Sequence, residues 1–273
     1  MSSGPSGTGA GGQPLEDPRP DSLIEAIEDP TEAPLADESV AQPAPARGWS
    51  PAGPPPTTLV LIRHGVTPHT VDKRFSGGLA SANPGLSDLG REQVRATAEW
   101  LQNMHLDAVI ASPVRRTLES AEIIAEVLGH DLETEAGFAE MEFGDWDGMT
   151  FGEVAEKHQA DLDAWLGSVD VAPPGGESMR AVQARVLAGL DRTLAAHTGR
   201  TIAVVSHVTP IKTLVSHAVQ APLDSLFRME LTPASVSVVS FHENSGRNGD
   251  ERVGSLRLFN ARPGDEILPP ARF

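Results

Sequence analysis

The chain has 273 residues, of which 39% are hydrophobic and 22% are charged, as is usual for a soluble globular protein. Its formal net charge of −17 repels other anions, so we expect no nucleic-acid or membrane partner. The absence of cysteine excludes disulfides, thiolate nucleophiles and cysteine-ligated metals. No apolar run reaches the roughly 18 residues of a membrane helix, and no secretory signal opens the chain. We therefore expect a cytoplasmic protein.

The first 56 residues differ in composition from the rest of the chain. They hold 12 of the 23 prolines and nine acidic residues against two arginines, with Trp49 as their one aromatic residue. Such a segment buries too little apolar surface to offset the entropy lost on ordering. We predict a disordered acidic tail at 1–56, a folded domain at 57–262 and a short C-terminal tail at 263–273.

Strand-like and helix-like patterns alternate from residue 58 onward. Apolar runs rich in β-branched residues indicate buried strands, and helical spacing between capping and stop residues indicates helices. In chain order the predicted elements are a strand at 58–63, a helix at 87–103, a strand at 108–111, helices at 113–128 and 178–197, a strand at 201–206, a helix at 210–219, and strands at 236–241 and 255–259. This alternation predicts an α/β three-layer sandwich, with a mostly parallel central sheet and helices on both faces.

Histidines follow two of the predicted strands. The first strand runs into Arg63, His64 and Gly65, and the strand at 201–206 runs into His207. Ligand sites in such folds lie beyond the carboxyl ends of the strands. The helix after His207 presents free N–H groups and a positive dipole end, which suit an anion. A single histidine at a strand end is more often hydrogen-bonded to backbone than part of a site. The prediction of an anion site therefore rests on the two histidines together.

The strand at 108–111 is followed by Ser112, Pro113, Val114, Arg115 and Arg116. Two arginines in the first turn of a helix are unfavourable for its dipole. They are either solvated or ion-paired, or they point a guanidinium at a phosphate and bind it with two parallel hydrogen bonds. In the second case, arginines at strand ends would give this acidic protein a local positive pocket.

An acidic residue, Glu140, stands among apolar and aromatic neighbours in the segment FAEMEFGDWDG at 138–148. A carboxyl in such surroundings suits a general acid that works near neutral pH. The alternative is an ordinary surface acid in a loop.

Taken together, these segments resemble the histidine phosphatase superfamily, which contains cofactor-dependent phosphoglycerate mutases and many phosphomonoesterases. The matching segments, in the expected order, are RHG at 63–65, LSDLG at 86–90, SPVRR at 112–116, EMEFGDWDG at 140–148 and VVSH at 204–207. The strings PPGGES at 173–178 and SHVTPIKTL at 206–214 look closest to α-ribazole phosphatases, and to the phosphatase half of proteins that fuse a ribonuclease H domain to such an enzyme. The leader before residue 58 has no room for a ribonuclease H domain.

The resemblance implies a phosphoglycerate mutase-like fold and a phosphomonoesterase that acts on a small phosphorylated metabolite without cofactor or metal. It implies that His64 accepts the phosphoryl group and that Arg63 and Arg116 grip its oxygens. By the same resemblance His207 stabilises the transferring group and Glu140 protonates the leaving oxygen. α-Ribazole 5'-phosphate is one candidate substrate. A mutase and a catalytically silent phosphate-binding module are the alternatives.

The sequence departs from the family pattern at two positions. Val66 stands where the family often has glutamate, and Thr70 stands where it often has asparagine. We expect the Thr70 hydroxyl to donate to phosphate in place of the amide. Further candidates for substrate binding are Thr67, Arg74 and Glu177. The nine histidines show no usual metal spacing, so we expect no metal site, and the sequence predicts no particular oligomeric state.

Overall fold

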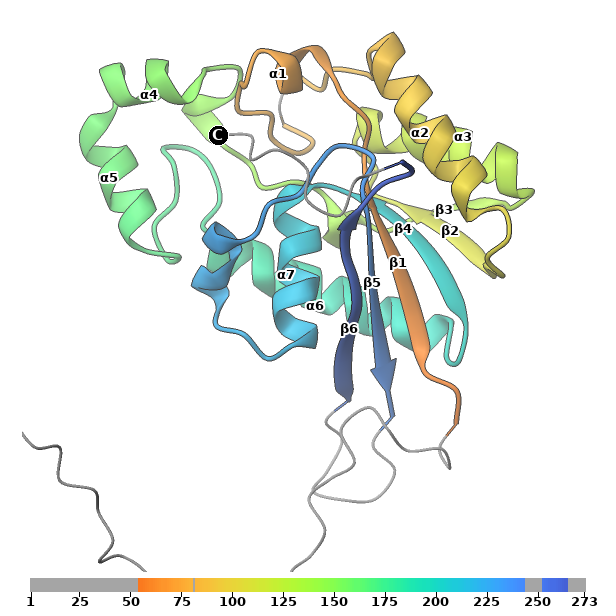
Figure 1. Ribbon diagram of the computed structural model, residues 1–273. Helices are drawn as coiled ribbons and strands as arrows, with labels where there is room; N and C mark the ends of the chain where they lie inside the picture. The colour runs from red at the N-terminus through yellow and green to blue at the C-terminus, as the bar shows by residue number, and fades with distance from the viewer. Residues whose placement is uncertain (1–53, 81, 244–251, 265–273) are drawn as a thin grey trace, which may run out of the picture. The chain divides into compact units, whose positions relative to one another are not determined.

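A computed structural model of the chain describes residues 54–80, 82–243 and 252–264. The predicted tail at 1–56 lies outside the described residues except at 54–56, and so does most of 263–273. Within the described part, one mixed sheet has the strand order β3-β2-β4-β1-β5-β6 (Figure 1). Its strands are β1 (Thr57–Arg63), β2 (Ala108–Ala111), β3 (Leu132–Thr134), β4 (Thr201–Ser206), β5 (Val236–His242) and β6 (Val253–Ala261). β1 to β4 are parallel, β5 pairs antiparallel with β1, and β6 pairs antiparallel with β5 at the edge. This mostly parallel sheet confirms the predicted α/β architecture.

The register of the central strands sets where the sheet ends. Arg63 on β1 lies opposite Ser206 on β4, and Ala111 on β2 lies opposite Val205. The three strands therefore finish at the same level, and the residues that follow them emerge side by side. The buried, β-branched runs of these strands explain why they occupy the middle of the sheet.

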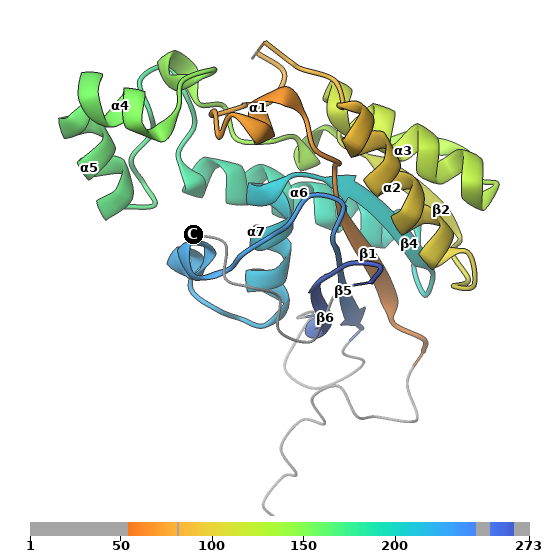
Figure 2. The same cartoon turned by 45° about the horizontal axis from the view of Figure 1, so that its top comes forward.

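Helices cover both faces of the sheet (Figures 1 and 2). On one face, Val60 and Ile62 of β1 pack in one apolar cluster with residues of α2 (Asp88–Leu101) and α3 (Arg115–Leu128). On the other face, Leu59 and Leu61 pack with residues of α6 (Met179–Ala196) and α7 (Val208–Ala218). The alternation of side chains along β1 thus builds two cores, which gives the predicted three layers.

The predicted helix positions are confirmed, with small corrections at their ends. Ser87 caps α2 by accepting from the Gly90 N–H at 3.1 Å, as expected. Leu89 keeps roughly helical spacing with Val94 and Ala98, but it is 54% exposed whereas those two side chains are buried. α3 begins at Arg115 with Val114 as its N-cap, so Pro113 precedes the helix and does not occupy its first turn.

Several short elements were not predicted. They are β3, α1 (Pro68–Val71), α4 (Phe151–Lys157), α5 (Gln159–Gly167) and the short helical turns η1 (Ala136–Phe138), η2 (Gly144–Trp146) and η3 (Leu223–Arg228). In both views α1, α4 and α5 lie beyond the carboxyl ends of the parallel strands (Figures 1 and 2). None of the described helices combines the length and the apolar character needed to cross a bilayer.

Candidate active site

The two predicted histidines meet where β1 and β4 end. The backbone N–H of His64 donates to the Ser206 carbonyl at 3.1 Å, which ties the end of one strand to the other. His207 is the N-cap of α7. The two imidazole rings lie with their centroids 5.2 Å apart, and the side chains are almost fully buried. The structure thus brings together the histidines that the sequence placed at separate strand ends.

The hydrogen bonds of His64 define its protonation. Its Nδ1 lies 2.8 Å from the Gly65 carbonyl oxygen, which can only accept, so the ring proton is on Nδ1. Its Nε2 accepts from the Nε–H of Arg116 at 3.2 Å. Burial lowers the pKa of His64 well below 6.5, and the nearby charges of Arg116 and Arg63 lower it further. The ring is therefore a neutral imidazole with its lone pair on Nε2, where Arg116 donates to it.

His207 is held by a residue to which the sequence gave no role. Its Nε2 lies 2.8 Å from the Ser112 hydroxyl, which stands at the end of β2. Its Nδ1 is buried and has no hydrogen-bond partner among the described residues. Burial, followed by the charge of Arg116, lowers the pKa of His207 well below 6.5. Ser112 could have been singled out, because it is the first residue after a strand that ends level with β4.

Two guanidinium groups lie beside the histidines. Arg116 is buried, and its Nη2 donates to the carbonyls of Ser76 and Gly77 at 3.1 and 3.0 Å. Arg63 donates to the Leu231 carbonyl, and loss of hydration lowers the pKa of Arg63 to about 10, so it stays charged at neutral pH. Arg63 Nε and Arg116 Nη1 are shielded from solvent and lack partners within the described chain. Two unused charged donors in one pocket fit an anion.

The other arginine of the SPVRR segment faces away from this cluster. Arg115 pairs with Glu119 at 2.8 Å on the exposed side of α3. The choice of Arg116 over its neighbour as the pocket residue therefore agrees with the structure.

Glu140 reaches the same pocket from the loop after η1. Its side chain is almost buried, and its Oε1 accepts from the backbone N–H groups of Met141 at 2.9 Å and Thr209 at 3.3 Å. Thr209 lies in the first turn of α7, so Glu140 occupies one of the free N–H groups that the sequence analysis had assigned to a bound anion. The Glu140 carboxyl is thus bonded to a residue that lies only two positions after His207 at the start of α7.

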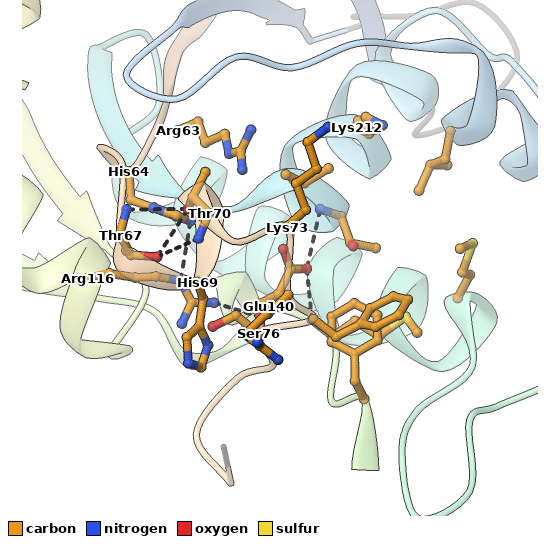
Figure 3. A pocket seen from close by; sticks show the side chains of 18 of the residues that line it. Arg63, His64, Thr67, His69, Thr70, Lys73, Ser76, Arg116, Glu140 and Lys212 are labelled. Carbon is orange, nitrogen blue, oxygen red and sulfur yellow. Dashed lines mark hydrogen bonds between the residues drawn. The ribbon is translucent and has the colours of Figure 1, made fainter. Parts of the chain in front are cut away.

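The remaining predicted site residues have mixed positions. Thr67 caps α1, and its hydroxyl lies 3.1 Å from that of Thr70; both line the pocket near His64 (Figure 3). Arg74 also lines it, but its Nη1 donates to the Gly148 carbonyl and to Glu153 at 2.8 and 3.2 Å. Glu177 does not line the pocket and instead forms an ion pair with Arg185 at 2.8 Å.

The pocket has a volume of about 450 Å³ and contains cations that the sequence analysis missed. Lys212 lies on α7, three residues after Thr209, and burial and the charge of Arg63 lower the pKa of its half-buried amine. Lys73 also lines the pocket, and Figure 3 shows both lysines among its lining residues. Within residues 54–80, 82–243 and 252–264, no group of three or more His, Asp or Glu side chains could hold a metal ion.

Comparisons with known proteins agree with this arrangement. A family model described as Histidine phosphatase superfamily (branch 1) matches residues 59–248. A bifunctional protein of Mycobacterium tuberculosis is 38% identical over 227 residues, which cover 83% of this chain and 58% of that protein. The chain thus spans 58% of the length of that relative. Phosphoserine phosphatase 1 of Hydrogenobacter thermophilus is 32% identical over 186 residues, which cover 68% of this chain and 87% of the relative.

Solved structures give the same result. A mycobacterial glucosyl-3-phosphoglycerate phosphatase in complex with VO3 superposes with a TM-score of 0.65 at 28% identity, covering 76% of this chain and 99% of that one. The α-ribazole phosphatase of Shigella flexneri has a TM-score of 0.66 at 24% identity, covering 76% and 97%. At that identity the second likeness concerns the fold alone.

Proposed function

The chain belongs to the histidine phosphatase superfamily, and from that premise we propose that it is a phosphomonoesterase that works through a phosphohistidine on His64. Relatives named as phosphatases and as a phosphoglycerate mutase support a phosphatase or mutase activity. The observation that carries the proposal of a phosphohistidine is the environment of His64: a neutral ring beside two arginines, each with a buried N–H group that has no partner among the described residues.

In the first proposed step, His64 Nε2 attacks the phosphorus atom of the bound ester. The bond from phosphorus to the alcohol oxygen breaks, and Glu140 gives its proton to the departing oxygen. The hydrogen bond from Arg116 Nε to His64 Nε2 must give way to the incoming phosphoryl group, which leaves Arg116 free to donate to phosphate oxygens. The Gly65 carbonyl keeps the proton on Nδ1, so the new bond forms on Nε2.

In the second proposed step, water hydrolyses the phosphohistidine. Glu140, now a carboxylate, takes a proton from the water, whose oxygen bonds to phosphorus as the bond to Nε2 breaks. Inorganic phosphate leaves, and both His64 and Glu140 return to their starting states. The two arginines balance the negative charge of the transferring group in both steps, and the neutral His207 can donate a hydrogen bond to it.

The proposal includes metal independence. Phosphoryl transfer requires positioning and positive charge, and Arg63, Arg116 and the half-buried Lys212 bring that charge from the chain itself. We expect turnover to be unchanged by a strong chelator. The substrates are small organic phosphates, with α-ribazole 5'-phosphate as one candidate.

The function is tested by following inorganic phosphate released from a panel of monoesters without a bisphosphate primer. Release without primer is expected of a phosphatase, whereas a mutase requires the primer. His64→Ala is expected to lower kcat by about a thousandfold or more with the fold intact. His105→Ala, which removes a well-exposed histidine, is the matched control and should retain activity. A His64→Ala variant with nearly normal turnover would refute the proposal.

A further inference from the structure

Beyond the phosphate-binding end, the pocket has a wall of aromatic rings. The rings come from four segments: Phe75 after α1, Phe143 before η2, Trp165 on α5 and Phe227 on η3. They contact one another, with centroid separations of 4.8 Å for Phe75 and Phe143 and 6.3 Å for Trp165 and Phe227. Figure 3 shows ring side chains on the far side of Glu140 from His64.

This wall is more than the surface of the apolar core. Phe227 lines the cavity and is 46% exposed, so its ring is available to a ligand. Trp165 also lines the cavity, and its buried Nε1 has no hydrogen-bond partner within the described chain. A cavity of about 450 Å³ falls in the range that encloses a whole small molecule, well beyond one phosphoryl group.

We infer that the alcohol part of the substrate carries a flat aromatic group, which packs against this wall while the phosphate lies between His64 and Arg63. This inference rests on the proposed function for the position of the phosphate. Aromatic rings prefer offset or edge-on contacts with other rings, and the half-exposed ring of Phe227 is available for such a contact. The inference separates this site from one that serves small polar alcohols, such as the serine of phosphoserine.

The test compares pairs of ligands that differ only in a phenyl ring. Propyl phosphonate and phenylpropyl phosphonate cannot be hydrolysed, so calorimetric binding measures the wall without requiring catalysis. We expect phenylpropyl phosphonate to bind about tenfold more tightly or better. The matching phosphate esters have similarly basic leaving groups, and their kcat/KM values should differ in the same direction.

A substitution assigns the effect to the wall. Phe227→Ala should reduce the preference for the phenyl ligand by about fivefold, while Trp100→Ala, an equally exposed aromatic on α2 outside the pocket lining, should leave it unchanged. Equal binding of the two phosphonates would overturn the inference, even if both esters are hydrolysed. Failure to hydrolyse either ester, together with a phenyl preference in binding, would instead count against the proposed function alone.

A second inference comes from a different observation, the hydrogen bonds of Arg185 on α6. Its Nε and Nη2 donate to the two carboxylate oxygens of Glu177 at 2.9 and 2.8 Å. Its Nη1 donates to the carbonyls of Gly137 and Ala139 at 3.0 and 2.7 Å, and Nη2 also donates to the Glu140 carbonyl at 2.9 Å. The five N–H groups of the guanidinium are thus matched by five hydrogen bonds.

These bonds surround the segment that carries the proposed general acid. Glu177 also accepts from the Glu142 N–H at 3.0 Å, so the pair binds backbone on both sides of the Glu140 side chain. We propose that Arg185 and Glu177 are positioning residues, which hold the Glu140 carboxyl in place next to α7. This reassigns Glu177 from substrate binding to a role in support of Glu140, and it rests on the proposed function of Glu140 as the acid.

The test uses the leaving-group dependence of the reaction. Protonation matters for an alkyl phosphate and little for p-nitrophenyl phosphate, whose leaving group is stable as an anion. The comparison uses kcat/KM, which reports transfer to His64 and excludes the later hydrolysis step that both esters share. Arg185→Lys and Glu177→Gln should lower kcat/KM for the alkyl ester by about tenfold and for the aryl ester by less than about twofold. Arg192→Lys is the control. Arg192 lies on the same helix as Arg185 and forms a similar pair of hydrogen bonds with a carboxylate, that of Glu135, but it makes no hydrogen bond to residues 139–142.

The outcomes separate this inference from the proposed function. Equal losses of kcat/KM on both esters in Arg185→Lys and Glu177→Gln would overturn the positioning role if Glu140→Gln itself lowers kcat/KM far more for the alkyl ester than for the aryl ester. If Glu140→Gln lowers kcat/KM equally for both esters, the role of Glu140 as acid is refuted, and the positioning role with it.

Discussion

The Gly65 carbonyl oxygen lies 2.8 Å from His64 Nδ1, and this hydrogen bond decides which ring nitrogen can react. A carbonyl accepts only, so it holds the ring proton on Nδ1 and leaves the lone pair on Nε2. Burial keeps the ring uncharged at neutral pH. A nucleophile of defined tautomer is thus built from a strand end and the residue that follows it.

The buried histidines make stability depend on pH. The folded-state pKa values of His64 and His207 lie well below 6.5, whereas both residues take up protons near 6.5 when unfolded. The free energy of unfolding is therefore largest above that pH, and it falls below it by up to about 1.4 kcal/mol per pH unit for each histidine. Denaturant unfolding at about pH 7.5 and about pH 5 measures this slope. The double variant His64→Gln/His207→Gln should have a flatter slope, and an unchanged slope would exclude these histidines as its source.

Ser112→Ala tests whether the Ser112 hydroxyl orients His207. The substitution leaves His207 Nε2 buried without this partner, so the ring loses its fixed orientation. We expect kcat to fall about tenfold with KM changed less than about twofold. Ser240→Ala is the control, since it removes another buried serine hydroxyl, which lies 2.9 Å from the hydroxyl of Thr58 and outside the pocket lining. If the two variants have the same kcat, Ser112 serves stability alone.

Lys212→Met tests the cation that the sequence analysis missed. The side chain keeps its bulk but loses the charge that faces Arg63 and Glu140 in the pocket. We expect inorganic phosphate to inhibit about fivefold more weakly, because one favourable charge contact is lost. Lys157→Met on the exposed end of α4 should leave inhibition unchanged. Unchanged inhibition in Lys212→Met would place the amine outside the reach of the phosphate.

Gly90→Ala tests the contact that fixes the loop after His64. A methyl group at Gly90 would lie 2.1 Å from the Val66 carbonyl oxygen, so helix α2 must move away from this loop. We expect a loss of about 2 kcal/mol in the free energy of unfolding, and a reduced kcat. Gly152→Ala on α4, where a methyl group meets nothing within 4 Å, should be neutral or slightly stabilising. Equal stabilities of the two variants in denaturant unfolding would contradict the close packing.

The residues at strand ends could be predicted from the sequence because of how parallel strands align. The apolar runs before Arg63 and His207 are long enough to identify as central strands, and the carboxyl ends of such strands meet at one edge. The same rule indicated the pair Arg115 and Arg116 in the first turn after β2, and the resemblance to the family selected Arg116. The structure confirms that these positions converge.

The rest of the pocket could not be predicted from the alignment of strand ends. Trp165 and Phe227 lie on short elements, α5 and η3, which are stabilised by tertiary packing and have weak local signals. Glu177 was a candidate for substrate binding, but its carboxylate is bound by Arg185, eight residues later on α6, and nothing in the local sequence indicates that pairing. The N–H of Thr209 looked free for an anion, because nothing in the sequence shows that Glu140 reaches it from another loop.

The most direct test of the central claim is to trap the phosphoryl group on the protein. In Glu140→Gln, p-nitrophenyl phosphate can still transfer its phosphoryl group, but the base for the second step is missing, so the intermediate should accumulate. Alkaline quenching, peptide mapping and phosphorus NMR would then locate the label. We predict that it is bound to Nε2 of His64 and is absent from a variant that also carries His64→Ala. A label on His207, or release of phosphate with no label on His64, would contradict the account.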